Sequence, residues 1–192
     1  MNLLHWAFFE LRYLFGRAPW DTGVSPPELL QFLDTHPPGR AVDIGCGSGT
    51  NSLTMTRHGW QTTGLDFSWG AVRRARRRAE QAGLSIEFRR GDVGMLRTIP
   101  GPMDLALDIG CYHALEPERR QPYARDLGRL VRPGGSFLLY GFLVPDEPAG
   151  NRGIGEHEVA RRFGGLFELV VVARGTDRQR PSAWFSLRRT TG

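Results

Sequence analysis

Three alternating glycines are the first residues of this sequence that suggest ligand chemistry. They lie in VDIGCGSGT, residues 42–50, as Gly45, Gly47 and Gly49. Glycine has no side chain, so a backbone built in this way can bend sharply and can approach a bound ligand closely. In an open α/β sheet, ligands bind beside such a turn between a strand and a helix, although a tight turn without a ligand has the same pattern.

Two acidic residues further along the chain favour the ligand-binding interpretation. Asp66 follows the glycine run by about twenty residues, where a carboxylate can accept two hydrogen bonds from a ribose diol. Asp92 lies in GDV and could accept a hydrogen bond from an adenine amino group, while Val93 offers an apolar side chain and a backbone N–H. Each aspartate alone is typical of a turn. Together, at the ends of neighbouring strands, they predict an adenosine site.

The spacing of the glycines separates two classes of adenosine ligand. A dinucleotide site has the pattern G-x-G-x-x-G/A, whereas this chain has G-x-G-x-G and places Thr50 where the third small residue would lie. The pattern therefore disfavours a nicotinamide cofactor.

Alternating strands and helices are predicted to position these residues. Short apolar runs bounded by glycines predict strands, and longer segments between them predict helices. The predicted strands are 41–46, 61–67, 86–90, 103–110 and 136–143, and the predicted helices are 50–58, 68–83 and 117–131. Such alternation implies right-handed crossovers and a parallel sheet that is covered on both faces.

The two ends of the chain depart from this alternation. The apolar residues 1–16 predict a short helix, either a lid over the site or plain core, and a second helix is predicted to begin at Pro26 with Ser25 as its cap. After a long loop over 144–155 and a helix near 156–163, the segments 167–175 and 183–189 predict an antiparallel hairpin joined by TDRQRPS. The loop is long enough to suggest a flap over a substrate.

Composition limits the class of protein and its partners. The chain has 192 residues, a mass of 21.5 kDa and 25 basic residues, all of them arginine, with a net charge of +5. We expect a single domain over 1–192, with a lid and helix in 1–38 and the core in 39–192. The arginine run 73–78 is interpreted as a solvated helix face, and a nucleic-acid partner is disfavoured. Two cysteines are too few for a disulfide framework or a zinc site, which favours the cytoplasm.

Several of these elements, in this order, resemble the class I S-adenosylmethionine-dependent methyltransferases. The matching segments are VDIGCGSG, the strand that ends at Asp66, GDV, MDLALDIG, LVRPGGSFLLY and the final hairpin. The resemblance implies a doubly wound, Rossmann-like α/β fold with a seven-stranded sheet, mostly parallel with an antiparallel last strand. It also implies S-adenosylmethionine as cofactor, held by the residues Asp43, Gly45, Cys46, Gly47, Gly49, Asp66, Phe67, Asp92 and Val93.

Two further segments are similar to the thiopurine and tellurite-resistance branch of small-molecule methyltransferases. In PWDTG, the resemblance implies that Trp20 and Asp21 fold over the cofactor. In LDIGCYHAL, residues 107–115, it implies that Asp108 faces the methionine end of the cofactor and that Tyr112 and His113 face the acceptor. These three are the candidate catalytic residues. His113 could serve as a base, or it could only form a hydrogen bond at the end of the strand.

The predicted function is methyl transfer to a small molecule without a metal, with a thiol or another soft nucleophile as the preferred acceptor. Such an acceptor arrives deprotonated and needs no strong base. Three alternatives stay open: an O- or N-methyltransferase that uses His113 as base, a nucleic-acid-binding protein with this fold, and a protein that binds adenosylmethionine without turnover. The pattern says nothing of the oligomeric state.

Overall fold

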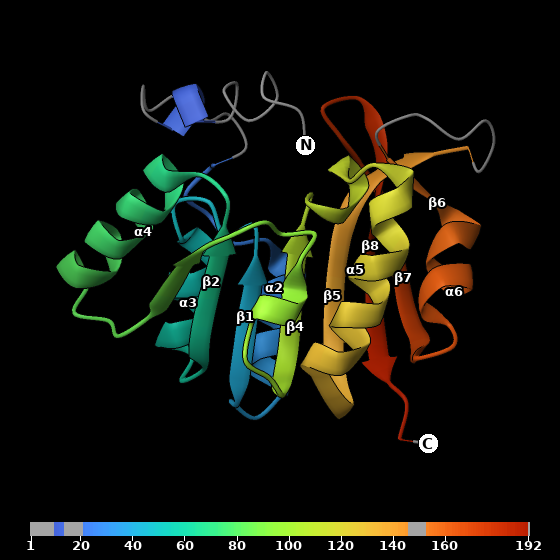
Figure 1. Ribbon diagram of the computed structural model, residues 1–192, viewed down its shortest axis with the longest axis horizontal. Helices are drawn as coiled ribbons and strands as arrows, with labels where there is room; N and C mark the ends of the chain where they lie inside the picture. The colour runs from blue at the N-terminus through green and yellow to red at the C-terminus, as the bar shows by residue number, and fades with distance from the viewer. Residues whose placement is uncertain (1–9, 14–20, 146–152, 192) are drawn as a thin grey trace. The chain divides into compact units, whose positions relative to one another are not determined.

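The computed structural model describes residues 10–13, 21–145 and 153–191 of the 192-residue chain. The contacts divide the chain into two compact units, residues 1–93 and 94–192 (Figure 1). The interpretation of the chain as one domain stays a prediction.

The first unit is built on three parallel strands. These are β1 (Arg40–Ile44), β2 (Gln61–Asp66) and β3 (Glu87–Arg90), and β2 lies between the other two. The helices are α2 (Pro27–Thr35), α3 (Thr50–Arg57) and α4 (Trp69–Gln81). Because α3 and α4 each follow a parallel strand, the glycine run between β1 and α3 and the segment between β2 and α4 are both placed at the carboxyl end of the strands.

A small hydrophobic cluster holds α3 and α4 to this sheet. Leu53 of α3 and Phe88 of β3 pack with Val72, Ala75 and Ala79, which recur along one face of α4. This spacing is the amphipathic stripe of a helix that lies on a core, and it leaves most of the arginines of α4 on the opposite face.

The second unit contains a mixed sheet in the order β4-β5-β8-β7. Its strands are β4 (Met103–Ile109), β5 (Val131–Val144), β7 (Phe167–Asp177) and β8 (Arg180–Arg189), with the two-residue β6 (Ile154–Gly155) paired to β5. β4 and β5 are parallel, and β8 is antiparallel to both β5 and β7. The helix α5 (Pro117–Leu130) packs on β5, and α6 (Glu156–Phe163) packs on β7 (Figure 1).

The C-terminal hairpin is confirmed, but its turn is tighter than predicted. β7 and β8 pair as far as Asp177 and Arg180, so only Arg178 and Gln179 lie between the strands. Both residues have positive φ, 49° and 63°, as a two-residue hairpin turn requires. The polar sequence TDRQRPS suggested a longer loop because neither arginine nor glutamine favours this conformation.

Three other local predictions are wrong. β5 begins at Val131 and includes the Pro-Gly-Gly segment expected as a turn, where the pairing with β4 shifts register between Met103 and Leu105. Ser25 does not cap α2, since the cap position is Pro26; its hydroxyl donates instead to Thr54 Oγ1, at 2.8 Å. The arginine run is not entirely solvated, as described below.

Two predicted segments lie largely outside the described residues. Of the N-terminal helix, residues 10–13 are described and are helical. Of the loop over 144–155, residues 146–152 fall outside the described part, and so does the flap that it suggested.

The predicted fold class is confirmed: parallel strands that alternate with helices are followed by an antiparallel C-terminal hairpin. None of the helices in the described ranges is long and apolar enough to cross a membrane.

Candidate cofactor and acceptor sites

The glycine turn after β1 is held tightly against the end of β2. Gly45, Gly47 and Gly49 all have positive φ, between 54° and 83°, which side-chain-bearing residues rarely adopt. The backbone N–H groups of Gly45 and Cys46 donate to Leu65 O at 2.7 and 3.0 Å. The turn therefore needs its glycines for its shape, and its backbone is fixed by the strand beside it.

Asp66 completes this arrangement from the end of β2. Its Oδ2 accepts from Gly47 N at 3.0 Å and its Oδ1 from Ser68 N at 2.8 Å, and the residue is 5% exposed. Burial raises the pKa of Asp66 to about 6, although these backbone hydrogen bonds oppose the shift. Each carboxylate oxygen can accept more than one hydrogen bond, so both retain capacity for a donor from a ligand.

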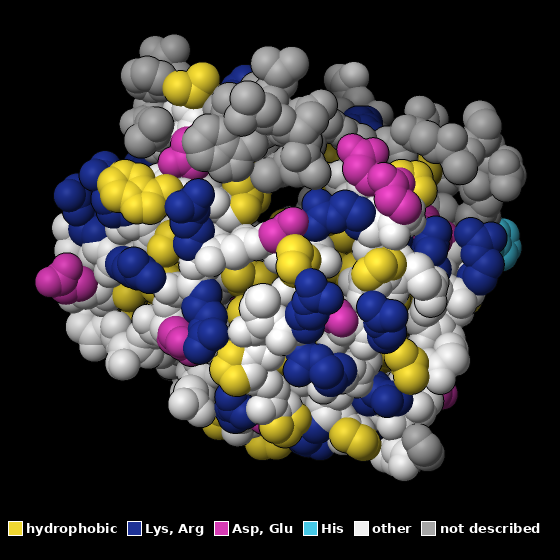
Figure 2. Space-filling view, viewed as in Figure 1, with side chains coloured by type: hydrophobic (Ala, Val, Ile, Leu, Met, Phe, Trp, Pro, Cys, Tyr) yellow, Lys and Arg dark blue, Asp and Glu magenta, His cyan; other side chains and the backbone are white. Residues whose placement is uncertain are grey.

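Arg78 supports the glycine turn from α4. Its Nη1 donates to Ser48 O at 3.1 Å and to Thr50 Oγ1 at 3.0 Å, and it also contacts Ser48 Oγ. The other arginines of the run are exposed, and Figure 2 shows basic side chains over α4 at the left of the view: Arg73, Arg74, Arg76 and Arg77. The helical period could have separated Arg78 from these, because it follows the buried Ala75 by three residues.

A helical turn formed by residues 10–13 also belongs to this end of the first unit. Glu10 is 7% exposed, and its Oε1 accepts from Gly70 N at 2.9 Å, at the start of α4. Tyr13 is buried as well, and its hydroxyl oxygen lies 2.6 Å from the place where a Cβ on Gly47 would be. The apolar pattern of residues 1–16 predicts a short helix, but it contains no local signal for the contacts that Glu10 and Tyr13 make.

Of the other residues predicted to hold the cofactor, two carboxylates have partners near the glycine turn. Asp43 is buried and its Oδ2 accepts from Ser52 Oγ at 2.6 Å. Asp21 is half-buried and its Oδ1 accepts from Thr50 Oγ1 at 3.3 Å, so the segment after residue 20 reaches the start of α3.

The remaining members of the predicted cofactor set are more dispersed. Cys46 is buried in the cluster beneath α3 and α4. Phe67 is half-buried and its carbonyl oxygen accepts from Arg90 Nε at 3.2 Å. Asp92 is exposed, and Val93 beside it is buried. Trp20 lies outside the described residues.

In the second unit, Asp108 holds the turn that follows β4. It is fully buried, and its carboxylate accepts from Cys111 N at 2.8 Å, from Tyr112 N at 3.1 Å and from Tyr123 OH at 2.6 Å. Burial raises the pKa of Asp108 to about 6 against the effect of these hydrogen bonds. The observed contacts of Asp108 are thus internal ones that shape η2 (Tyr112–Ala114).

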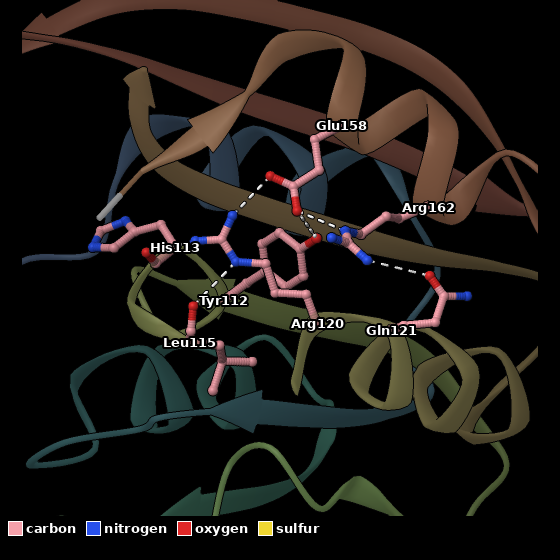
Figure 3. Close-up of polar contacts among 7 residues, drawn as sticks. All are labelled: Tyr112, His113, Leu115, Arg120, Gln121, Glu158 and Arg162. Carbon is pink, nitrogen blue, oxygen red and sulfur yellow. Dashed lines mark hydrogen bonds and ion pairs between the residues drawn. The ribbon is translucent and has the colours of Figure 1, made fainter. Parts of the chain in front are cut away.

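Tyr112 points into a buried polar cluster that joins η2 to α5 and α6 (Figure 3). Its hydroxyl donates to Glu158 Oε1 at 3.0 Å, and the guanidinium of Arg120 lies 5.4 Å from its ring centre. Glu158 also binds Arg120 and Arg162, each at 2.7 Å. Burial raises the pKa of Tyr112 far above its usual value, and the charge of Glu158 adds to this shift. The hydroxyl therefore stays protonated at neutral pH.

Opposing effects act on the carboxyl group of Glu158. Burial alone would raise its pKa, but the hydrogen bond from Arg162 and the charge of Arg120 outweigh burial and lower the pKa below its usual value. Sequence reasoning missed both Arg120 and Glu158, because their ion pair joins residues that are far apart in the chain and lie on two different helices.

His113 differs from Asp108 and Tyr112 in that it is only half-buried. Its ring is tilted against the ring of Phe142, with 5.3 Å between the ring centres. Its Nδ1 accepts a hydrogen bond from Phe142 N at 3.4 Å. Its carbonyl oxygen accepts from Arg120 Nη2 at 3.3 Å and from Gly153 N at 3.1 Å. The backbone of His113 is thus anchored, while part of its side chain reaches solvent.

The predicted site residues form two groups, one in each unit. The structure brings Asp66 together with Gly47, and it brings Asp108, Tyr112 and His113 together around η2. Among the described residues, no group of three or more His, Cys, Asp or Glu side chains is placed to hold a metal ion.

Comparison with known proteins agrees with these features. A family model described as "Methyltransferase domain" matches residues 41–135. The chain is 27% identical over 133 residues to a 2-heptyl-1-hydroxyquinolin-4(1H)-one methyltransferase of Mycobacteroides abscessus, covering 67% of this chain and 58% of the relative. It is 31% identical over 143 residues to thiocyanate methyltransferase 1 of Brassica oleracea, covering 70% and 61%. The chain therefore spans about three fifths of the length of these curated relatives.

The fold has solved counterparts. One is the Burkholderia thailandensis 1,6-didemethyltoxoflavin-N1-methyltransferase, solved with S-adenosylhomocysteine, which matches with a TM-score of 0.79 at 22% identity and covers 96% of this chain and 87% of that one. At this identity the likeness shows the fold alone. The glycine turn, the matched family model and the curated relatives together support the predicted resemblance to the class I S-adenosylmethionine-dependent methyltransferases.

Proposed function

We propose that this protein transfers a methyl group from S-adenosylmethionine to a small molecule, and that the preferred acceptor is a thiol. The observation that carries the proposal is the glycine turn fixed against Asp66, because it offers a bare backbone and a buried carboxylate at one place. The residues for which we propose a role in holding the cofactor are Asp43, Gly45, Cys46, Gly47, Gly49, Asp66, Phe67, Asp92 and Val93, together with Trp20 and Asp21.

The residues present in the first unit fit the adenosine part of the cofactor. The positive φ angles favour glycine in the turn, which leaves its backbone bare, and the carboxylate of Asp66 retains acceptor capacity for a hydroxyl donor. Asp92 is exposed and could accept from the adenine amino group beside the apolar Val93. When bound, the cofactor supplies a methyl group on a positively charged sulfur. The protein then contributes mainly by aligning the acceptor and excluding water.

The contacts of the second unit support an acceptor that needs no base. Asp108 has three hydrogen-bond donors of its own, and the Tyr112 hydroxyl is committed to Glu158 and stays protonated. We propose that both act as positioning residues for the turn that carries His113. A thiol with a pKa of about 8.5 supplies a fraction of reactive thiolate at neutral pH without help, whereas a hydroxyl acceptor requires a positioned base. The printed names of the thiocyanate and thiol methyltransferases among the relatives point the same way.

A second candidate reaction is O- or N-methylation with His113 as base. It is favoured by one observation: His113 is the half-buried member of the three predicted catalytic residues. The relative named for a hydroxyquinolone acceptor adds to this candidate.

An acceptor panel with matched histidine variants tests the proposal. The full chain is incubated with S-adenosylmethionine and an aliphatic thiol, a phenol or an amine, and methylated product is quantified. We expect product from the thiol, and a loss in His113→Gln of less than about tenfold. The control His58→Gln changes an exposed histidine of the first unit. Product from the phenol or amine alone, lost by about 10²-fold or more in His113→Gln, would favour the second candidate.

A further inference from the structure

Glu10 carries a buried oxygen that nothing in the described structure satisfies. Its Oε1 accepts from Gly70 N at 2.9 Å, but its Oε2 is buried and has no hydrogen-bond partner. The side chain as a whole is 7% exposed. A buried carboxylate oxygen without a donor is costly, and in a native protein it commonly marks a place that a ligand or an ordered water completes.

The surroundings of Glu10 identify which ligand this would be. Its charge is close enough to Asp66 to raise the pKa of that carboxyl further, after the larger effect of burial. Tyr13, three residues along the same helical turn, places its hydroxyl against Gly47. Glu10 thus belongs to the same end of the first unit as the glycine turn and Asp66, although it comes from a separate segment of the chain.

Two buried carboxylates at the same end of the first unit, one of them with an unsatisfied oxygen, favour a ligand with at least two hydrogen-bond donors. The like charges repel each other, and this repulsion contributes to the raised pKa of Asp66 after the larger effect of burial. A vicinal diol presents two O–H donors on adjacent carbons. One hydroxyl can donate a hydrogen bond to each carboxylate, and the diol brings no charge of its own. Adenosine has one such diol, on its ribose.

We propose that Glu10 is a second acceptor for the ribose diol of the cofactor, so that the diol is shared between Glu10 and Asp66. The inference rests on the proposed function, since it concerns the same cofactor. It assigns the helical turn 10–13 to cofactor binding through a side chain, with Oε1 held by the start of α4 and Oε2 available for the ribose.

A purely structural role for Glu10 makes a different prediction. If the side chain only anchors the turn 10–13 to α4, the bond from Gly70 N accounts for its function and Oε2 has no role. Removing the negative charge would then leave cofactor affinity unchanged. If Glu10 binds the diol, the same change weakens binding and also relieves its repulsion with Asp66 in the free protein.

Calorimetric titration of the full chain with S-adenosylhomocysteine separates these cases. We expect Glu10→Gln to bind about tenfold more weakly than wild type, because a charged acceptor becomes a neutral one. Its thermal midpoint without ligand should equal or exceed that of wild type. The matched control is Glu80→Gln, which alters an exposed glutamate on α4 and should bind as wild type does. If Glu10→Gln does not fold, Glu10→Asp keeps the charge but withdraws it by one methylene, and it should show the same loss.

A second measurement changes the ligand as well as the protein. Adenosine analogues that lack the 2′ or the 3′ hydroxyl should each bind more weakly than adenosine to wild type, and the loss for one of them should shrink in Glu10→Gln. Equal affinity of wild type and Glu10→Gln for S-adenosylhomocysteine would overturn the role of Glu10 while leaving the proposed function intact. Failure of wild type itself to bind S-adenosylhomocysteine would overturn the proposed function, and this inference with it.

Discussion

Asp66 and Asp108 have the same place in their units but different contacts. Each ends a parallel strand, each is buried, and burial raises the pKa of each to about 6. Asp66 receives backbone N–H groups only, from Gly47, Ser68 and Phe67, whereas Asp108 receives backbone N–H groups and, in addition, the hydroxyl of Tyr123. The additional donor makes Asp108 a residue of the protein's own framework, and the remaining capacity of Asp66 suits it to a ligand. Burial and pKa alone do not separate the two roles.

The largest effect should come from removing Asp108. In Asp108→Ala, two backbone N–H groups and the Tyr123 hydroxyl lose their acceptor in a buried place, so we expect the free energy of unfolding to fall by about 4 kcal/mol. Denaturant unfolding measures this change. A loss below about 1 kcal/mol would mean that Asp108 is not the structural member of the pair.

Removing Asp66 should instead act on the cofactor. We expect Asp66→Ala to weaken S-adenosylhomocysteine binding by about 100-fold, since a charge-assisted hydrogen bond to the ribose is lost and Gly47 N in the glycine turn loses its acceptor. Its unfolding free energy should change less than that of Asp108→Ala, because no buried side-chain hydroxyl loses its acceptor when Asp66 is removed. Calorimetry and denaturant unfolding on the same preparations test both statements. An Asp34→Ala variant, altered at an exposed position of α2, is the control for binding.

A smaller effect should follow from the donor that distinguishes the two sites. Tyr123→Phe removes the 2.6 Å hydrogen bond to Asp108 and leaves its backbone donors in place. We expect a loss of about 2 kcal/mol in unfolding free energy, the usual value for a hydrogen bond to a charged group. The pKa of Asp108 should rise further, which NMR titration of the carboxyl carbon would detect. An unchanged pKa would contradict the contribution of this bond.

The smallest effect is the dependence of stability on pH. Because Asp66 and Asp108 have folded-state pKa values near 6, above the usual 3.8, the folded state binds protons more tightly than the unfolded state. Stability of the ligand-free protein should therefore rise as pH falls from 7 to 5, by about 1 kcal/mol for each group. Glu158 has a lowered pKa and opposes this trend only below its usual pKa of 4.5. Asp66→Asn and Asp108→Asn should each remove the contribution of one group to this pH dependence. Unfolding curves that do not depend on pH in this range would contradict the raised pKa values of Asp66 and Asp108.

The sequence predicted the elements of the fold more accurately than the contacts of the site. Apolar runs and glycines located β2 and α5 to within a residue or so of their observed bounds, because the burial of a strand or a helix face leaves a local period. The ends of β7 and β8 were missed because pairing between the strands overrides the local preference of Arg178 and Gln179.

Within the candidate sites, the sequence identified residues but not their partners. It located Asp66 and Asp108 through their position after strands, but only the structure distinguishes their contacts. It did not indicate that the charge of Glu10 would act on Asp66, or that Arg120 would pair with Glu158, since such pairs join segments that are remote along the chain. Local periodicity carries no information about which remote side chains meet.

The glycine turn has one further consequence, which concerns entropy. Glycine loses more conformational freedom on folding than any other residue, and here three of them are fixed at positive φ, with Gly45 N bonded to Leu65, Gly47 N to Asp66 and Gly49 N to Cys46. That loss of freedom occurs when the first unit folds, before any ligand arrives. A ligand that binds along this turn encounters a backbone already in place, so its affinity is not reduced by the ordering of a flexible loop.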